Sequence, residues 1–176
     1  MVYLFLADGF EEIEAVCTVD ILRRCGVDVK TVSVMKDIMV TGAHGILLKA
    51  DMSIENISDN GDMYVLPGGM TGVENMAKCN KLCEILKSTS AYIAAICAAP
   101  TLIASLGLLK DKKAICYPSL ENELHCAKIT SQSVVTDGRV ITSMGPGTSF
   151  DFGFEIAGLL IGKEVAESVK NGMLVK

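Results

Sequence analysis

The fold is decided by residues 92–100, which read Tyr-Ile-Ala-Ala-Ile-Cys-Ala-Ala-Pro. The apolar run Tyr92–Ile96 is typical of a buried strand, and it continues into Cys97 with no turn residue between them. A helical stretch follows over residues 98–106, and Gly107 ends it. A direct strand-to-helix turn that carries one nucleophile between small residues is typical of a nucleophile elbow, in which a strained turn pushes the side chain out of the sheet. The helix N-terminus would favour a thiolate at Cys97, whereas the plain alternative is a buried core thiol.

Strands and helices alternate on both sides of this stretch. Residues 2–7 predict a buried strand, residues 11–25 a helix and residues 27–35 a second strand, a unit that normally gives two parallel strands with a right-handed crossover. The other expected elements are a small hairpin over 40–48, strands at 63–66 and 113–117, helices over 71–87, 150–161 and from 164, a polar helical stretch at 119–124, and a hairpin over 133–143 that turns at Asp137–Gly138. The sequence therefore predicts a single α/β domain over residues 1–176, with a mostly parallel sheet and helices on both faces.

Ligands of open parallel sheets bind at the carboxyl ends of the strands, and two further strand ends carry unusual residues. The strand at 63–66 ends in Pro67-Gly68-Gly69, where two backbone N–H groups would suit an oxyanion pocket and the plain alternative is a tight turn. The first strand ends in an acidic segment, residues 8–14. Spacing alone does not single out Glu14 from the other carboxylates of this segment, so Glu14 also fits a solvated helix position.

The two histidines test whether a cysteine–histidine dyad is present, because such a dyad needs an imidazole within hydrogen-bonding reach of the sulfur. His44 lies in the predicted hairpin turn, and His125 follows the polar helical stretch. Neither follows a strand that should end beside Cys97, although the hairpin could fold over the pocket and bring His44 to it. No three ligands converge in the sequence pattern, so no metal site is expected.

Composition excludes several classes of protein. The chain has 176 residues and a formal net charge of −5, with no run of Lys and Arg, so no specific nucleic-acid binding is expected. The first apolar run is too short for a signal peptide or a membrane helix, so no membrane association is expected. Seven cysteines occur without a CxxC pair, which is typical of small core residues in a reducing cytosol, and a cytoplasmic location is the expectation.

Four motifs in this order resemble the DJ-1/ThiJ/PfpI superfamily, and its DJ-1/ThiJ-type branch in particular. They are DGFEEIE at 8–14, LPGG at 66–69, AAICAAP at 94–100 and TSMGPGTSF at 142–150. The resemblance covers nearly the whole chain. It implies a flavodoxin-like sandwich, similar to class I glutamine amidotransferases, a homodimer, and chemistry without a cofactor.

The same resemblance assigns roles to individual residues. The elbow cysteine maps onto Cys97, and the glutamate that contacts its sulfur maps onto Glu14, which as a protonated acid would donate a hydrogen bond to the sulfur. The oxyanion pocket maps onto Gly68, Gly69 and Ala98, where the N–H groups of Gly69 and Ala98 donate and Gly68 shapes the turn. Three more residues are expected to line the pocket, namely His44, Tyr117 and, in the GPGTS loop, Pro146.

Departures from the family pattern narrow the chemistry. Where the family pattern has a histidine near the elbow cysteine, this chain has Tyr117. Where the protease-like branch has a histidine directly after the nucleophile, this chain has Ala98. A Cys–His protease is therefore disfavoured. Two arginines of the family pattern correspond to His44 and Met144, and loss of their charge argues against an anionic ligand.

The resemblance implies a cysteine-dependent glyoxalase or deglycase that converts methylglyoxal or glyoxal to lactate or glycolate. Cys97 would be the nucleophile, and Glu14 would donate and shuttle the proton. The alternative is an oxidative-stress sensor or redox-regulated chaperone that uses oxidation of Cys97 without turnover. A role in thiazole monophosphate biosynthesis is disfavoured, because the chain has no phosphate-binding loop.

Overall fold

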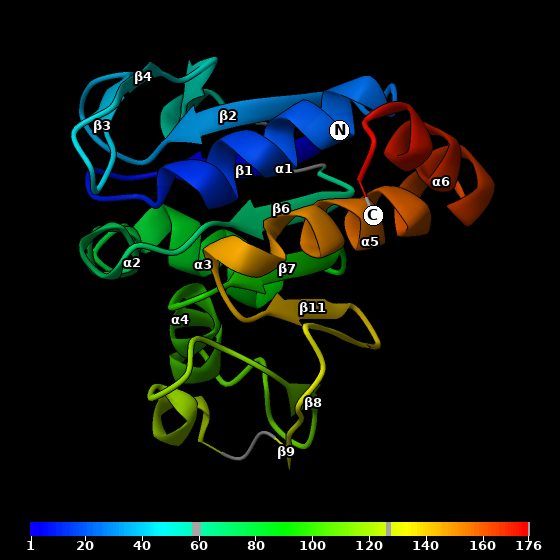
Figure 1. The fold of residues 1–176 in the computed structure, drawn as a ribbon. Coiled ribbons are helices and arrows are strands. Elements are labelled where there is room, and N and C mark those ends of the chain that lie inside the picture. The colour runs from blue at the N-terminus through cyan, green and yellow to red at the C-terminus, as the bar shows by residue number, and fades with distance from the viewer. Residues whose placement is uncertain (58–60, 126–127, 176) are drawn as a thin grey trace.

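The computed structural model describes residues 1–57, 61–125 and 128–175. Seven strands form one sheet in the order β10-β11-β7-β6-β1-β2-β5 (Figure 1). Only β10 and β11 are antiparallel, and the other neighbouring strands are parallel. The strands are β1 (Val2–Leu6), β2 (Val29–Ser33), β5 (Met52–Ser53), β6 (Met63–Leu66), β7 (Tyr92–Ile96), β10 (Val134–Asp137) and β11 (Val140–Ser143).

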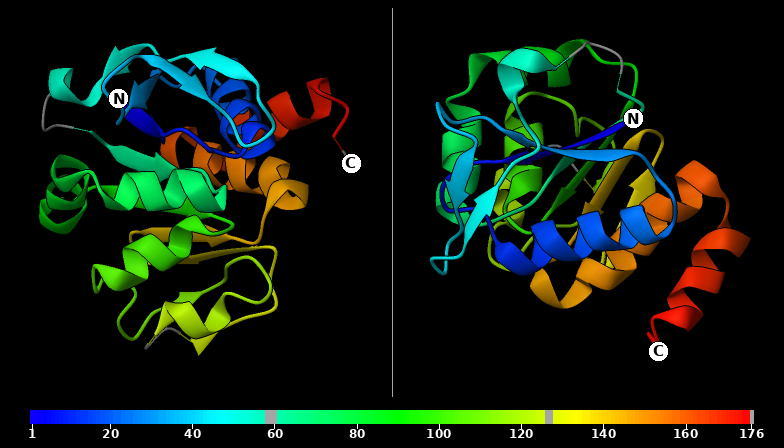
Figure 2. Two further views of the ribbon diagram at one scale, coloured as in Figure 1. Left: turned by 90° about the vertical axis from the view of Figure 1, so that its left-hand side faces the viewer. Right: turned by 90° about the horizontal axis from the view of Figure 1, so that it is seen from above.

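Helices cover both faces of this sheet. The long helices α1 (Glu12–Arg24) and α5 (Ser149–Ile161) pack side by side on one face, and α6 (Lys163–Gly172) packs against α5 (Figures 1 and 2). The other face carries α2 (Met70–Ala77), α3 (Asn80–Ser88) and α4 (Ala99–Ser105). The predicted three-layer α/β arrangement is confirmed.

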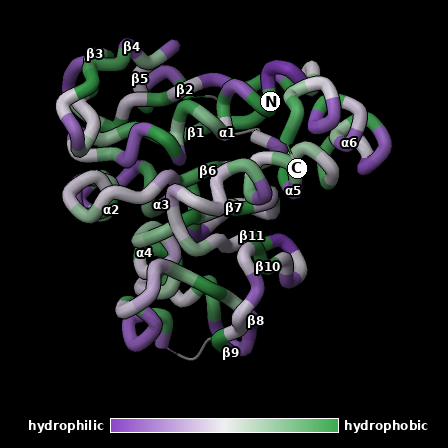
Figure 3. The backbone as a smooth tube through the Cα atoms, viewed as in Figure 1, coloured by the Kyte–Doolittle hydropathy of each residue, from purple (hydrophilic) through white to green (hydrophobic). Residues whose placement is uncertain are grey.

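The central strands are apolar along their whole length because both of their faces are covered. Every residue of β1 and β6 is buried, and these strands are mostly in the hydrophobic colours of Figure 3. The ring of Tyr64 in β6 stacks on the rings of Tyr3 and Phe5 in β1, with centroid distances of 6.1 and 6.0 Å. This packing fixes β6 against β1, and therefore fixes the loops that follow the two strands.

The carboxyl ends of β1, β6 and β7 meet at one edge of the sheet. β6 pairs in parallel with β1 on one side and with β7 on the other. The segments that follow Leu6, Leu66 and Ile96 therefore converge, as parallel topology requires. These are the three strand ends in which the sequence placed its candidate residues.

Two predictions outside the main sheet had different outcomes. The hairpin is confirmed, as β3 (Met39–Thr41) pairs antiparallel with β4 (Leu47–Lys49). The strand expected over 113–117 is wrong in length and place. β8 covers only Lys113–Ala114 and forms a separate two-stranded sheet with β9 (Lys128–Ile129). The chain leaves the strand there because the N–H of Ile115 donates to the side-chain hydroxyl of Thr142 instead of to a backbone carbonyl.

Short turns complete the chain. Three single turns of 3-10 helix, η1 (Ile54–Asn56), η2 (Glu121–Leu124) and η3 (Pro146–Thr148), lie in the connections, and η2 stands where the polar helical stretch was expected. Cys126 lies outside the described residues, and the six cysteines that the structure describes are unpaired. No helix in the described part of the chain is long and apolar enough to cross a membrane.

Candidate active site

Cys97 is the turn residue between β7 and α4, and its backbone is strained. Its φ is +65°, a left-handed value that costs a non-glycine residue on the order of 1–3 kcal/mol. Two hydrogen bonds hold it there, since its N–H donates to the Ser143 carbonyl (3.0 Å) and its carbonyl accepts from the N–H of Tyr117 (2.8 Å). The predicted elbow geometry is therefore present at Cys97.

Glu14 lies in the first turn of α1, directly after the carboxyl end of β1, and is fully buried. Its Oε2 accepts the N–H of Gly68 at 2.6 Å, and the carboxyl group is within hydrogen-bonding reach of the Cys97 sulfur. No described residue donates a hydrogen bond to the buried Oε1. A buried carboxylate oxygen without a donor is costly, so protonation of the Glu14 carboxyl group is favoured.

Gly68 is required where the three strand ends meet. A Cβ at this position would lie 2.6 Å from the Cβ of Cys97 and 2.7 Å from Oε2 of Glu14, closer than real atoms approach. Its N–H is occupied by Glu14, so Gly68 orients the acid, as well as shaping the turn. The N–H groups that reach the Cys97 sulfur belong to Gly69 and Ala98.

Burial and their mutual contact shift the pKa values of Cys97 and Glu14 strongly. Burial raises the pKa of Glu14 to about 7, against the opposing hydrogen bonds from Gly68 and Cys97. Burial and the Glu14 charge raise the pKa of Cys97 to about 12, against the N–H groups of Gly69 and Ala98. The pair therefore loses its first proton near pH 7, and the negative charge then lies mostly on the Glu14 carboxylate.

The helix N-terminus was expected to favour a thiolate at Cys97. Burial and the adjacent carboxylate outweigh that effect and raise the pKa of the thiol instead. A thiolate forms at this site when Glu14 holds the shared proton.

The raised pKa of Glu14 makes stability depend on pH. Because the pKa of Glu14 is 4.5 in the unfolded chain and about 7 when folded, its contribution to stability is full below pH 4.5 and is lost as pH rises through 7. At 1.36 kcal/mol per pKa unit, the free energy of unfolding of the wild type should fall by about 3 kcal/mol relative to Glu14→Gln across this range. Urea unfolding of both proteins at several pH values measures it, and a difference that stays constant with pH would contradict the burial argument.

The other residues expected at the pocket have different environments. Tyr117 reaches the elbow through its backbone N–H, and its half-exposed ring lies beside Gly145. Pro146 opens η3 and is partly buried. His44 has a largely exposed side chain whose Nδ1 lies 2.9 Å from Oε2 of Glu12, so its contact is with a neighbouring carboxylate.

Sequence reasoning missed two features. Ser143 anchors the elbow through its backbone carbonyl, and no side-chain pattern carries that signal. The expectation of no converging metal ligands also fails, because the hairpin brings His44 to Glu11 and Glu12. That convergence depends on tertiary contacts between the hairpin and the start of α1, which the residue spacing does not show.

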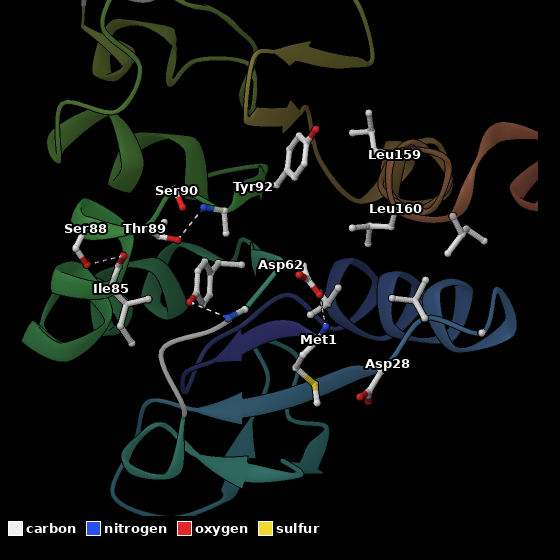
Figure 4. Close-up of a pocket in the computed structure, with 17 residues that line it drawn as sticks. Met1, Asp28, Asp62, Ile85, Ser88, Thr89, Ser90, Tyr92, Leu159 and Leu160 are labelled. Carbon is white, nitrogen blue, oxygen red and sulfur yellow. Dashed lines mark hydrogen bonds and ion pairs between the residues drawn. The ribbon is translucent and has the colours of Figure 1, made fainter.

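A large cavity is remote from Cys97. It has a volume of about 1020 Å³ and lies at the amino ends of β1, β6 and β7, lined among others by Asp28, Asp62, Tyr92 and Leu160 (Figure 4). The elbow lies at the opposite, carboxyl edge of the same strands. Size therefore does not identify the reaction site here, whereas the strained cysteine and the buried acid do.

Comparisons with known proteins show what the whole chain is similar to. Residues 1–159 match the model of the DJ-1/PfpI family. The chain is 36% identical to protein dj-1beta of Drosophila melanogaster over 98% of its length and 95% of the relative. The crystal structure of that protein superposes with a TM-score of 0.95 and covers 99% of this chain and 97% of the other.

Two further relatives extend the comparison. The chain is 38% identical to protein DJ-1 homolog B of Arabidopsis thaliana over 97% of its length, but spans only 40% of that relative. A Caenorhabditis elegans protein named glutathione-independent glyoxalase DJR-1.2 is 32% identical, over 90% of this chain and 87% of the relative.

Proposed function

This chain belongs to the DJ-1/PfpI family, and on that premise we propose that it is a cysteine-dependent glyoxalase that converts methylglyoxal to lactate or glyoxal to glycolate. The observation that carries the proposal is the buried Glu14 carboxyl group against the sulfur of the strained Cys97. A relative that bears the name of a glutathione-independent glyoxalase supports the substrate class. Conversion of free dicarbonyl also lowers the level of labile adducts, so a deglycase effect follows from the same chemistry.

The first step is addition of the thiolate to the aldehyde. When Glu14 holds the shared proton, the Cys97 sulfur bonds to the aldehyde carbon, and the carbonyl π electrons move onto oxygen. The N–H groups of Gly69 and Ala98, which reach the sulfur, are placed to stabilise that oxyanion. Glu14 then protonates the oxygen to give a hemithioacetal and is left as a carboxylate.

The second step moves hydrogen between the two carbons. The Glu14 carboxylate removes the proton from the carbon that bears sulfur, the electron pair forms a C=C bond, and the π electrons of the neighbouring carbonyl move onto its oxygen to give an enediolate. Glu14 returns the proton to the neighbouring carbon, and the hydroxyl proton of the first carbon passes to the oxygen of the second. The product is a lactoyl thioester, in which the first carbon has been oxidised and the second reduced. Water cleaves the C–S bond to release lactate and restores the Cys97 thiol, so no external oxidant or cofactor is consumed.

A sensor without turnover is the second candidate function. The N–H donors of Gly69 and Ala98 and the acid proton of Glu14 would stabilise the oxygens of a sulfinate on Cys97 as well. Against this candidate, Cys97 is only 9% exposed and its pKa is raised, whereas selective oxidation by peroxide favours an exposed thiolate. Dose-dependent oxidation of Cys97 by peroxide without dicarbonyl consumption would favour the sensor.

We also propose that the chain forms a homodimer. Large apolar side chains are exposed on α1 and on the adjacent hairpin, namely Ile13, Val16, Ile46 and Leu47. Between these elements lies a groove of about 290 Å³ that Val16 and Leu48 both line. A second copy of the chain would cover this apolar surface, since exposed apolar patches of this kind mark protein interfaces.

Light scattering tests the dimer. At micromolar concentration the expected mass is twice the 18.7 kDa of the chain. The double substitution Ile46→Glu and Leu47→Glu should halve it, because charge would have to be buried in the interface. The matched control, Ile129→Glu, changes an exposed isoleucine on β9 and should leave the dimer intact. A wild-type mass of one chain would refute the dimer.

A further inference from the structure

A second group of chemically active side chains lies where the hairpin meets the start of α1. Glu11 is the N-cap of α1, Glu12 is its first residue, and His44 lies between β3 and β4. One donor atom from each lies within 4.8 Å of the donor atoms of the other two. The hairpin is held in place by hydrogen bonds from the N–H of Gly9 to the Thr41 carbonyl and from the N–H of Ala43 to the Phe10 carbonyl, both 2.8 Å.

The two carboxylates are buried without a permanent positive charge. Glu11 is 7% and Glu12 6% exposed, and His44 is the ion-pair partner that the structure records for either of them among its described residues. Oε2 of Glu11 accepts the N–H of Glu14 at 2.7 Å. Oε1 of Glu12 also accepts the backbone N–H of His44 at 2.7 Å. Buried carboxylates are normally paired or bound to metal, and the cationic partner here is a titratable imidazole.

We propose that Glu11, Glu12 and His44 bind one divalent transition-metal ion of the zinc type. Nδ1 of His44 lies 2.9 Å from Oε2 of Glu12, so a shift of about half an ångström brings the two atoms to the separation of about 3.3–3.6 Å that tetrahedral ligands have around an ion with bonds of about 2.0–2.2 Å. The ion would replace the proton that these two atoms share. Three protein ligands leave a position for water.

The donor set selects the class of ion. Imidazole nitrogen with carboxylate oxygens suits zinc and its first-row neighbours, whereas magnesium and calcium prefer oxygen ligands alone. The site uses none of the groups that we assign to dicarbonyl chemistry. The metal proposal therefore goes beyond the proposed function and would still stand if the chain were not a glyoxalase.

Cobalt absorption combined with zinc calorimetry tests this site on the reduced, full-length chain after removal of metals with a chelator. Cobalt is informative because thiolate ligands give strong near-ultraviolet charge-transfer bands, and carboxylate and imidazole ligands do not. The variants are His44→Gln and Glu12→Gln, and the exposed His125 supplies the matched control His125→Gln. Because His44 is largely exposed, His44→Gln should fold normally even if Glu12→Gln does not.

The wild type should bind one equivalent of cobalt without thiolate bands, and zinc should displace it. His44→Gln and Glu12→Gln should weaken binding by at least about tenfold, the lower end of what loss of even an outer-shell partner costs, while His125→Gln binds as the wild type does. Binding with thiolate bands, affinity unchanged in His44→Gln, or no binding at millimolar metal would each overturn the proposal.

Discussion

Replacing Cys97 with serine is expected to lower the rate of lactate formation from methylglyoxal by at least about 10³-fold, which is a typical effect of removing a catalytic nucleophile. A hydroxyl group ionises far less readily than a thiol, and Glu14 beside it already opposes a second negative charge. The fold should be unaffected, because serine has nearly the size of cysteine and position 97 keeps the same backbone hydrogen bonds.

The measurement is lactate produced per enzyme in buffer free of amines and thiols, since both react with methylglyoxal. Cys116→Ser is a suitable control, because Cys116 is also a buried, unpaired cysteine and precedes the residue that hydrogen-bonds to the elbow. It should keep wild-type turnover. Retained activity in Cys97→Ser would remove Cys97 from the mechanism.

Glu14→Gln is expected to lower turnover by about 10²- to 10⁴-fold, the usual contribution of general acid–base catalysis. Glutamine keeps an oxygen to accept the Gly68 N–H and gains an amide donor for the sulfur. It cannot release a proton to the hemithioacetal oxygen or remove one from carbon. The site is therefore expected to stay assembled while the proton transfer stops.

The readout has two parts, the kcat for lactate formation and the rate at which peroxide oxidises Cys97. The kcat should fall sharply, whereas oxidation should survive because a hydrogen-bond donor to sulfur remains. An equal loss of both would show that Glu14 acts only on the thiol, not as a proton shuttle. Glu74→Gln, on the exposed side of α2, should change neither.

The sequence predicted the elbow because its signal is local. A buried strand that runs straight into Cys97, with small residues after it, allows few backbone conformations at the turn. The φ of +65° at Cys97 confirms the predicted strained turn. The parallel sheet was predictable for a similar reason, since the strand–helix–strand pattern at the start of the chain allows few topologies.

The rest of the site depends on contacts between distant segments. Spacing did not separate Glu14 from its neighbours, and only the family resemblance chose it; the structure shows that Glu14 is the carboxylate that meets Gly68 and Cys97. The raised pKa of Cys97 was missed because burial and a charge from another strand end cause it. The convergence of His44 with Glu12 likewise follows from how the hairpin packs.

The central claim is that Cys97 and Glu14 turn over a dicarbonyl, and the most direct test is the stoichiometry of the wild-type reaction. Methylglyoxal consumed and lactate formed are measured together, in amine-free and thiol-free buffer with no added cofactor. We expect one lactate for each methylglyoxal over many turnovers per chain. Consumption that stops near one equivalent per chain, with no lactate released, would contradict it and would mean that Cys97 only traps the aldehyde.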